Sequence, residues 1–216
     1  GSRATIADIL ADDGLKTDAP ALYAAADIFA GTMVRTAATI GGNVCCGSPS
    51  ADTVPALLTL GAEVTLASSS GTRTIALDEF YLDYKKTAMR QDELMVSISW
   101  DIPASNSANL FYKLARRKGD AITVTGVAVM IEADGGTCKT ARIALGSVGP
   151  TIFRATDAEN LLVGKSLDAG TIEQAAKAAA YACSPIDDIR AKAGYRLQTA
   201  QSLTRRLVSQ AWKQVA

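Results

Sequence analysis

The sequence predicts an α+β protein built from two units, because helix-forming and strand-forming patterns are grouped along the chain rather than strictly alternating. The chain has 216 residues, a length that suits one large domain or two small ones. The first half mixes helical segments with a hairpin, whereas the second half reads as strands followed by helices. The polar stretch "PASNSAN" separates the halves. We therefore expect a boundary near Ser105, between units 1–104 and 105–216.

Helices dominate the start of the first unit. Thr5 followed by Asp8 is typical of a helix start, in which the hydroxyl and the acid cap each other's backbone amides. A second helix is expected to begin near Pro20 and to end by Gly31.

The rest of the first unit is mixed. Residues 33–40 have a β-compatible composition, so we expect an extended segment that leads into a glycine pair. A short helix follows, with Pro55 in its first turn and Gly61 after its end. Residues 63–76 alternate in polarity around Ser-Ser-Gly, which predicts a hairpin, and residues 93–102 predict a further strand.

The second unit begins with three strand patterns, at residues 110–117, 122–133 and 139–148. The Asp-Gly-Gly sequence between the last two favours a tight hairpin turn. Helical patterns then occupy residues 157–164, 169–183 and 191–215. This order predicts an antiparallel sheet covered by helices.

Composition excludes several classes of protein. Lys+Arg and Asp+Glu number 22 each, so no basic excess favours a nucleic-acid partner. No apolar run approaches the ~20 residues of a membrane helix, and we expect no membrane partner. The four cysteines form no C-x-x-C pair, which favours free thiols, a reducing cytoplasmic location, and small buried roles for Cys45 and Cys46.

The chain contains no histidine. This absence removes Ser-His-Asp chemistry, histidine general bases and histidine-rich metal sites. We therefore expect no catalytic side chain and no metal site on this chain. Any difficult chemistry is expected to reside on a cofactor.

The stretch "TAATIGGNVCCGSPSAD", residues 36–52, is the candidate site. Gly41 and Gly42 permit either a plain turn or a loop whose bare amides close over an anion. Flanking and following polar groups, among them Asp52, could hydrogen-bond a ligand. Asp52 has a second interpretation, as the N-cap of the helix that follows. The stretch is neither a G-x-G-x-x-G fingerprint nor a P-loop.

Taken with other segments, this stretch resembles the FAD-binding (medium) subunit of molybdenum hydroxylases, the group of xanthine dehydrogenase, aldehyde oxidase and carbon monoxide dehydrogenase. The resemblance covers essentially the whole chain, and we expect bacterial xanthine-dehydrogenase-like subunits to be the most similar group. The motifs that carry it are "FAG" at 29–31, "ATIGGN" at 38–43, "SPSAD" at 48–52 with "PALLTLGAEV" after it, "DELMVSI" at 92–98, "YKLARRKGDAITV" at 112–124 and "GSVGPTIFRATDAENLL" at 146–162.

The resemblance implies that the first unit is the second subdomain of a two-part FAD-binding domain, followed by a C-terminal domain of antiparallel sheet plus helices. It also implies an electron-transfer flavoprotein. Electrons would pass from a molybdenum cofactor on a large subunit, through [2Fe–2S] clusters on a small subunit, to FAD here. The acceptor would be NAD, oxygen, quinone or another molecule.

The family's cofactor contacts map onto ten positions of this sequence: Phe29, Thr39, Ile40, Gly41, Gly42, Asn43, Ser48, Asp52, Met95 and Thr123. The resemblance implies that amides of the "TIGGN" stretch meet the pyrophosphate. Asp52 would lie along the FAD hydroxyls and ring, and Phe29 and Met95 would line the cofactor. Thr123 departs from relatives that carry lysine there, which leaves that contact and the flavin potential open.

A second departure is at the start. Relatives have a further N-terminal segment that supplies the first small subdomain and another phosphate loop. The sequence is thus consistent with a fragment, a proteolysed product or one half of a split subunit whose N-terminal FAD subdomain is a separate partner. We expect that segment to be needed for tight FAD binding.

Two other functions remain open at this point. One is a flavin-free docking or scaffold module of the same complex. The other is a stand-alone flavin oxidase of the vanillyl-oxidase type, which would need a cluster of polar catalytic groups that the sequence does not display.

Overall fold

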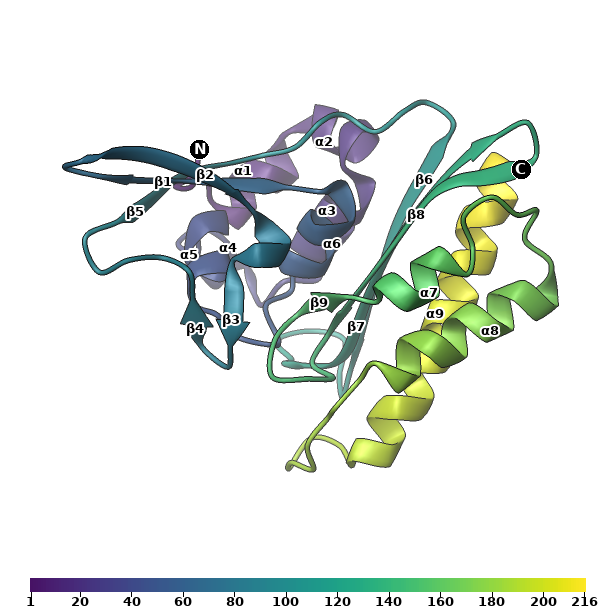
Figure 1. The fold of residues 1–216 in the computed structure, drawn as a ribbon. Coiled ribbons are helices and arrows are strands. Elements are labelled where there is room, and N and C mark those ends of the chain that lie inside the picture. Colours follow the sequence, from purple (N-terminus) through teal and green to yellow (C-terminus); the bar gives the residue numbers. More distant parts are fainter.

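The computed structural model describes residues 1–216, which form three layers with a central sheet as the middle one (Figure 1). On one side lie the helices and the small sheets of the first unit. On the other side lie three helices of the second unit. None of the helices is long and apolar enough to cross a membrane.

The first unit contains helices α1 (Ile6–Ala11), α2 (Asp13–Asp18), α3 (Pro20–Asp27), α4 (Thr32–Arg35), α5 (Ile40–Cys45) and α6 (Val54–Leu60). Its strands are β1 (Glu63–Ser68), β2 (Gly71–Ala76), β3 (Tyr81–Asp83), β4 (Lys86–Thr87) and β5 (Leu94–Ser99), with a 3₁₀ turn at Leu77–Glu79. The predicted hairpin is confirmed: β1 pairs antiparallel with β2, and β5 pairs with the other edge of β1.

The second unit contains strands β6 (Ser107–Ala115), β7 (Thr123–Asp134), β8 (Thr137–Gly146) and β9 (Phe153–Arg154), then helices α7 (Thr156–Asn160), α8 (Ala169–Tyr181) and α9 (Ala193–Val215). The four strands form one antiparallel sheet in the order β6-β7-β8-β9. Gly135 and Gly136 take positive φ angles of 55° and 79° at the β7–β8 turn, as the Asp-Gly-Gly pattern predicts.

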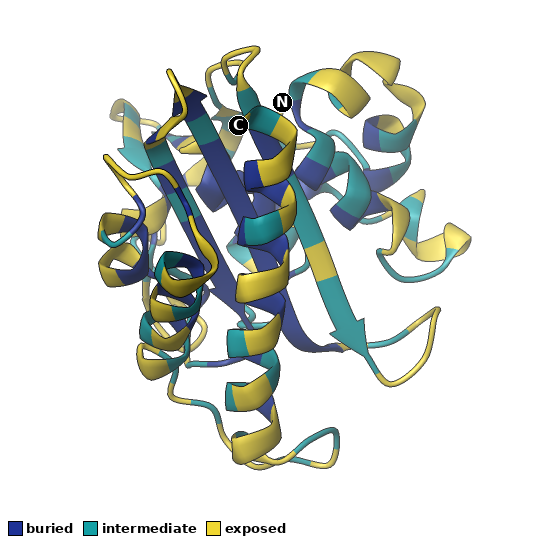
Figure 2. Cartoon of the chain, turned by 90° about the vertical axis from the view of Figure 1, so that its right-hand side faces the viewer, coloured by how far each residue is buried: buried dark blue, intermediate teal, exposed yellow.

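The inner strands of the central sheet are buried on both faces, whereas the edge strand β6 is mostly half-buried (Figure 2). Alternate residues of β7 point to opposite sides. Val127 and Val129 join the core beneath α8 and α9, whereas Ala128, with Ala144 of β8, joins the core beneath the first-unit helices. Both cores therefore depend on the same strands. The boundary near Ser105 stays a prediction about organisation along the chain.

Two local predictions about helix ends are confirmed. The Asp8 amide donates to Thr5 Oγ1 at 3.0 Å, and the Thr5 amide donates to Asp8 Oδ2 at 2.8 Å, which completes the capping box. Helix α6 ends at Gly61, whose φ of 68° is left-handed. This conformation suits glycine because it lacks a Cβ.

The expected extended segment at residues 33–40 is wrong. Residues 32–35 form helix α4, and Arg35 Nε donates to the Phe29 carbonyl at 2.6 Å, which folds the segment back on itself. Only Thr39 makes a β-type contact, a single bridge with Thr5.

The glycine pair is also not in a plain turn, because it lies in the first turn of helix α5. The Gly42 amide donates to Thr39 Oγ1 at 3.0 Å. This cap contributes about 1 kcal/mol, comparable to the helix cost of one glycine. The following cysteines are not both buried as expected, because Cys45 is half-buried and Cys46 is exposed.

Replacement of Gly61 should show how much the α6 terminus depends on glycine. An added Cβ would lie 2.7 Å from Arg142 Nη1 and would occupy a left-handed conformation. We expect Gly61→Ala to lower the free energy of unfolding by about 1–2 kcal/mol, measured by denaturant titration. Gly194→Ala is the control, since nothing lies near its Cβ position and its helical backbone suits alanine. Equal stability of Gly61→Ala and the wild type would contradict this account.

Candidate functional site

Helix α5 separates two hollows that together contain most of the predicted site residues. One, which we call the glycine hollow, has a volume of about 270 Å³ and is lined by Thr39, Gly41, Gly42 and Met95 among others. The other, which we call the central cleft, has a volume of about 530 Å³ and is lined by Phe29, Asn43, Ser48 and Asp52 among others. Two predicted residues lie elsewhere: Ile40 is in the hydrophobic core, and Thr123 is buried beneath Asp52.

The backbone amides at the start of α5 are already paired inside the chain. The Ile40 amide donates to the Ala4 carbonyl, and the Gly41 amide donates to the Ser2 carbonyl, each at 2.9 Å. With the Gly42 amide bonded to Thr39, the expected cradle of free N–H groups is not formed. An anion here would therefore meet side chains, or would displace one of these acceptors.

The two glycines have different roles. A Cβ on Gly41 would lie 2.7 Å from the Ser2 carbonyl oxygen, so glycine is needed for the close approach of the N-terminal segment. A Cβ on Gly42 would meet only Thr39 Oγ1, at 3.0 Å, and Gly42 is exposed. Gly42 therefore leaves open surface at the edge of the glycine hollow.

The Cys45 thiol and the Tyr81 phenol near α5 stay protonated. Burial raises the pKa of the Cys45 thiol, and Cys45 Sγ lies 3.8 Å from Met95 Sδ. Burial, with the nearby Cys45 and Cys46, also raises the pKa of the Tyr81 phenol, which donates to the Val44 carbonyl at 3.1 Å. The glycine hollow thus contains no activated nucleophile.

Asp52 joins the two units rather than capping a helix. Its Oδ2 accepts from Lys113 Nζ at 2.6 Å, and its Oδ1 accepts from Thr123 Oγ1 at 2.5 Å. The Lys113 and Asp52 side chains are only 5% and 10% exposed. The N-cap of α6 is instead Thr53, whose side chain makes no capping bond. The N-cap interpretation of Asp52 is therefore wrong.

Asn43 and Ser48 organise the loop between α5 and α6. Asn43 Oδ1 accepts from Thr53 Oγ1 at 2.7 Å, and no bond within the chain uses its Nδ2 group. Ser48 Oγ accepts from the Ser50 amide at 3.2 Å, which is a serine turn. Asn43 Nδ2 is thus a donor available to a ligand in the central cleft.

Ser147 fixes the same loop from the end of β8. Its amide donates to the Pro49 carbonyl at 2.7 Å, and its hydroxyl bonds the Ser50 hydroxyl at 2.8 Å. Ser147 holds a left-handed φ of 65°, which is unusual for a residue with a Cβ. The position of the loop is therefore set by the second unit as well as by its own sequence.

The structure adds cleft residues that the sequence did not single out. Tyr84 and Lys85 come from the β3–β4 hairpin, Asp120 and Ile122 from the β6–β7 loop, and Ile186, Asp188 and Arg190 from the α8–α9 loop. The only advance signal was the segment "SPIDDIRAK", a cluster of charged residues between two helices. Tyr84, Ile122 and Ile186 are more than half exposed, so the cleft has an apolar rim.

The fold is a two-unit α+β module with two hollows that could hold a ligand. Comparison with protein families gives the kind of ligand. Residues 1–105 match the FAD binding domain in molybdopterin dehydrogenase, and residues 110–211 match the CO dehydrogenase flavoprotein C-terminal domain.

Individual relatives agree with this result. The carbon monoxide dehydrogenase medium chain of Hydrogenophaga pseudoflava is 32% identical, over 97% of this chain and 72% of that protein. The xanthine dehydrogenase FAD-binding subunit of Escherichia coli O157:H7 is 29% identical, over 98% of this chain and 73% of that protein. A solved structure of carbon monoxide dehydrogenase from Hydrogenophaga pseudoflava superposes with a TM-score of 0.96 and 32% identity, covering 100% of this chain and 75% of that chain.

This chain belongs to the FAD-binding medium subunits of molybdenum hydroxylases, a family of oxidoreductases. The resemblance in the sequence and the expected fold class are confirmed. The lining of the hollows also fits FAD. The central cleft has an apolar rim and the side-chain donor Asn43 Nδ2, and the glycine hollow has open surface at Gly42.

The contact between Asp52 and Lys113 predicts a specific loss of stability. Asp52→Asn would leave the buried Lys113 ammonium without its counter-charge. We expect the free energy of unfolding to fall by about 3 kcal/mol, measured by denaturant titration. Asp52→Asn combined with Lys113→Met should recover part of the loss, because no uncompensated charge then remains.

The exposed Lys139–Glu132 pair supplies the control for this experiment. Lys139 is 59% exposed, so Glu132→Gln should cost at most about 1 kcal/mol. A helix cap alone would predict no loss in Asp52→Asn, since asparagine caps about as well as aspartate. An Asp52→Asn variant as stable as the wild type would therefore reject the ion-pair account.

Proposed function

We propose that this chain holds FAD across helix α5, with the phosphates at the glycine hollow and the ring in the central cleft, and passes electrons from a partner to an acceptor. The observation that carries the proposal is the position of the two hollows on either side of one short helix. Each has a surface suited to a different end of the cofactor.

The phosphate end is assigned from charge and space. Arg3 lines the glycine hollow and forms no salt bridge with any carboxylate. The Thr39 hydroxyl accepts from the Gly42 amide and keeps its own proton to donate. Together with the bare surface of Gly42, these groups favour an anionic ligand.

The ring end is assigned from the rim and floor of the central cleft. Phe29, Tyr84 and Ile122 offer apolar surface for a planar ring. Asn43 Nδ2 supplies a hydrogen-bond donor beside them. Asp52 contributes mainly by fixing the loop, because both its oxygens already accept bonds from Lys113 and Thr123.

Bound FAD supplies the two-electron chemistry, and this chain's residues bind, orient and shield it. No side chain here needs to act as acid, base or nucleophile. By analogy with the family, electrons would come from a molybdenum cofactor on a large subunit through [2Fe–2S] clusters on a small subunit. NAD is one candidate acceptor.

One observation favours a second candidate, a flavin-free docking module. The amides of Ile40, Gly41 and Gly42 and both oxygens of Asp52 are satisfied within the chain, so the structure is complete without a ligand there. Visible flavin absorbance of the purified subunit separates the two functions. A protein that stays colourless after incubation with FAD, even when the N-terminal segment of its relatives is supplied, would be a docking module.

Replacement of Gly42 tests the phosphate assignment without endangering the fold. With Thr39 as N-cap, Gly42→Glu creates a Thr-x-x-Glu capping box, so the melting temperature of the flavin-free protein should stay or rise. The new carboxylate would occupy and repel the phosphate position. We expect FAD affinity to fall at least tenfold, which is about 1.4 kcal/mol.

Gly170→Glu is the matched control, since Gly170 lies on α8 and lines neither hollow. It should leave both FAD affinity and the melting temperature close to wild type. Equal FAD affinity in Gly42→Glu and Gly170→Glu would overturn the placement of the phosphates at the glycine hollow.

A further inference from the structure

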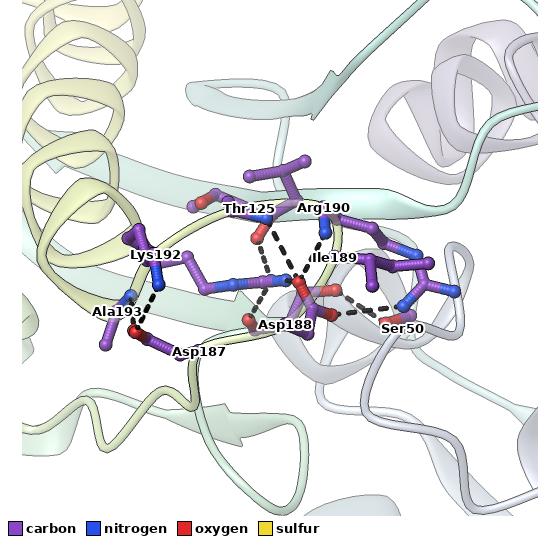
Figure 3. A network of polar contacts seen from close by, with 12 residues as sticks. Ser50, Thr125, Asp187, Asp188, Ile189, Arg190, Lys192 and Ala193 are labelled. Atoms are coloured by element: carbon purple, nitrogen blue, oxygen red, sulfur yellow. Dashed lines mark hydrogen bonds and ion pairs between the residues drawn. The ribbon is translucent and has the colours of Figure 1, made fainter.

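A cluster of charged residues, of which only Arg196 is fully buried, lies where the α8–α9 loop meets the ends of the central strands (Figure 3). Its cation is Arg196 of α9, which is 4% exposed. Arg196 Nη1 donates to the carbonyls of Val124 at 2.6 Å and Ser147 at 2.8 Å, and Nη2 donates to Asp188 Oδ1 at 2.9 Å. Arg196 thus fixes the strand ends from which Thr123 and Ser147 contact the loop between α5 and α6.

Asp188 is the anion of this cluster. Its Oδ1 also accepts the amides of Arg190 at 2.8 Å and Ala191 at 3.0 Å, and its Oδ2 accepts from Arg190 Nη1 at 3.0 Å. Burial opposes its ionisation, but the amides of Ala191 and Arg190 and the guanidinium groups of Arg196 and Arg190 outweigh burial and hold the pKa of Asp188 well below its usual range. Asp188 is therefore a permanent negative charge at neutral pH.

The cluster also forms part of the central cleft, because Asp188 and Arg190 line it. The ionised groups of the cleft and their direct partners are the carboxylates Asp52, Asp120 and Asp188 and the cations Lys85, Lys113, Arg190 and Arg196. Three carboxylates against four cations leave one net positive charge. Neutralising Asp188 would raise this net charge from one to two.

We propose that Asp188, Arg190 and Arg196 set the reduction potential of the flavin by fixing the charge that its ring meets. Asp188 and Arg190 act from the cleft wall, and Arg196 is a positioning residue that holds Asp188 and the strand ends. This inference rests on the proposed placement of the flavin ring in the central cleft.

The sign of the effect follows from charge balance. Reduction of a flavin above neutral pH adds two electrons and one proton to the ring, which therefore gains one negative charge. Added positive charge in the cleft favours the reduced form, and added negative charge favours the oxidised form. Relative affinity for the two forms sets the potential of the bound flavin.

The test compares charge variants in the FAD-loaded protein by equilibration with redox indicator dyes at pH 8. Asp188→Asn should increase the affinity for reduced over oxidised FAD about tenfold, which raises a two-electron potential by about 30 mV. Arg190→Gln should change the potential by a similar amount in the opposite direction. Arg196→Lys keeps the charge and three N–H donors, enough for the two carbonyls and Asp188, and should leave the potential near the wild-type value.

Asp187→Asn is the matched control, because it makes the same chemical change one residue away. Asp187 is 57% exposed, pairs with Lys192, and does not line the cleft. Its potential should equal that of the wild type. Fluorescence titration with oxidised FAD and melting of the flavin-free proteins should accompany every variant.

The outcomes separate the inference from the function beneath it. Opposite shifts in Asp188→Asn and Arg190→Gln, with Arg196→Lys and Asp187→Asn unmoved, support the inference. A merely structural cluster would weaken FAD binding or stability in all cluster variants without opposite shifts in potential, and that result overturns it. Should Asp188→Asn fail to fold, an unchanged potential in the less buried Arg190→Gln still overturns it. A wild-type protein that binds no FAD, even with the N-terminal segment of its relatives supplied, would instead reject the proposed function.

Discussion

The buried contact of Asp52 with Lys113 and Thr123 is the interaction on which the arrangement of the site depends. Lys113 lies on β6 and Thr123 begins β7, so one carboxylate of the first unit is held by two strands of the second. Opposite charges that are shielded from water attract strongly, and removing one of them leaves the other buried without a counter-charge. The loop between α5 and α6 cannot move away from the sheet without breaking this contact, so the contact holds the shape of the central cleft in the ligand-free protein.

Local rules predicted the parts of the fold that local physics decides. The Thr5–Asp8 capping box and the left-handed Gly61 involve neighbours within a turn, so the sequence contains all the necessary information. The strands of the second unit were predicted from their β-compatible composition and from the Asp-Gly-Gly turn, although β7 is buried on both faces and does not alternate in polarity. Most of the site residues that were predicted from the family motifs line one of the two hollows.

Errors arose where a distant partner decides the outcome. Helix propensity disfavours Gly41 and Gly42, but the carbonyls of Ser2 and Ala4 and the Thr39 cap complete the first turn of α5. Asp52 has the position of a helix cap, yet its partner Lys113 is 61 residues away. Asp188 and Arg190 were missed because they lie in the α8–α9 loop, which has no periodic sequence pattern. Nothing in the sequence therefore places that loop beside the loop between α5 and α6.

The doubly buried central sheet has a consequence for how such subunits can be divided. Ala128 and Ala144 face the first unit, while their neighbours Val127 and Ile143 face α8 and α9. A gene split near residue 105 would yield a second polypeptide whose sheet exposes one apolar face, because the helices that cover it belong to the first unit. That face would bind the first unit or a second copy of the same polypeptide, so we expect the two halves to be synthesised and assembled together.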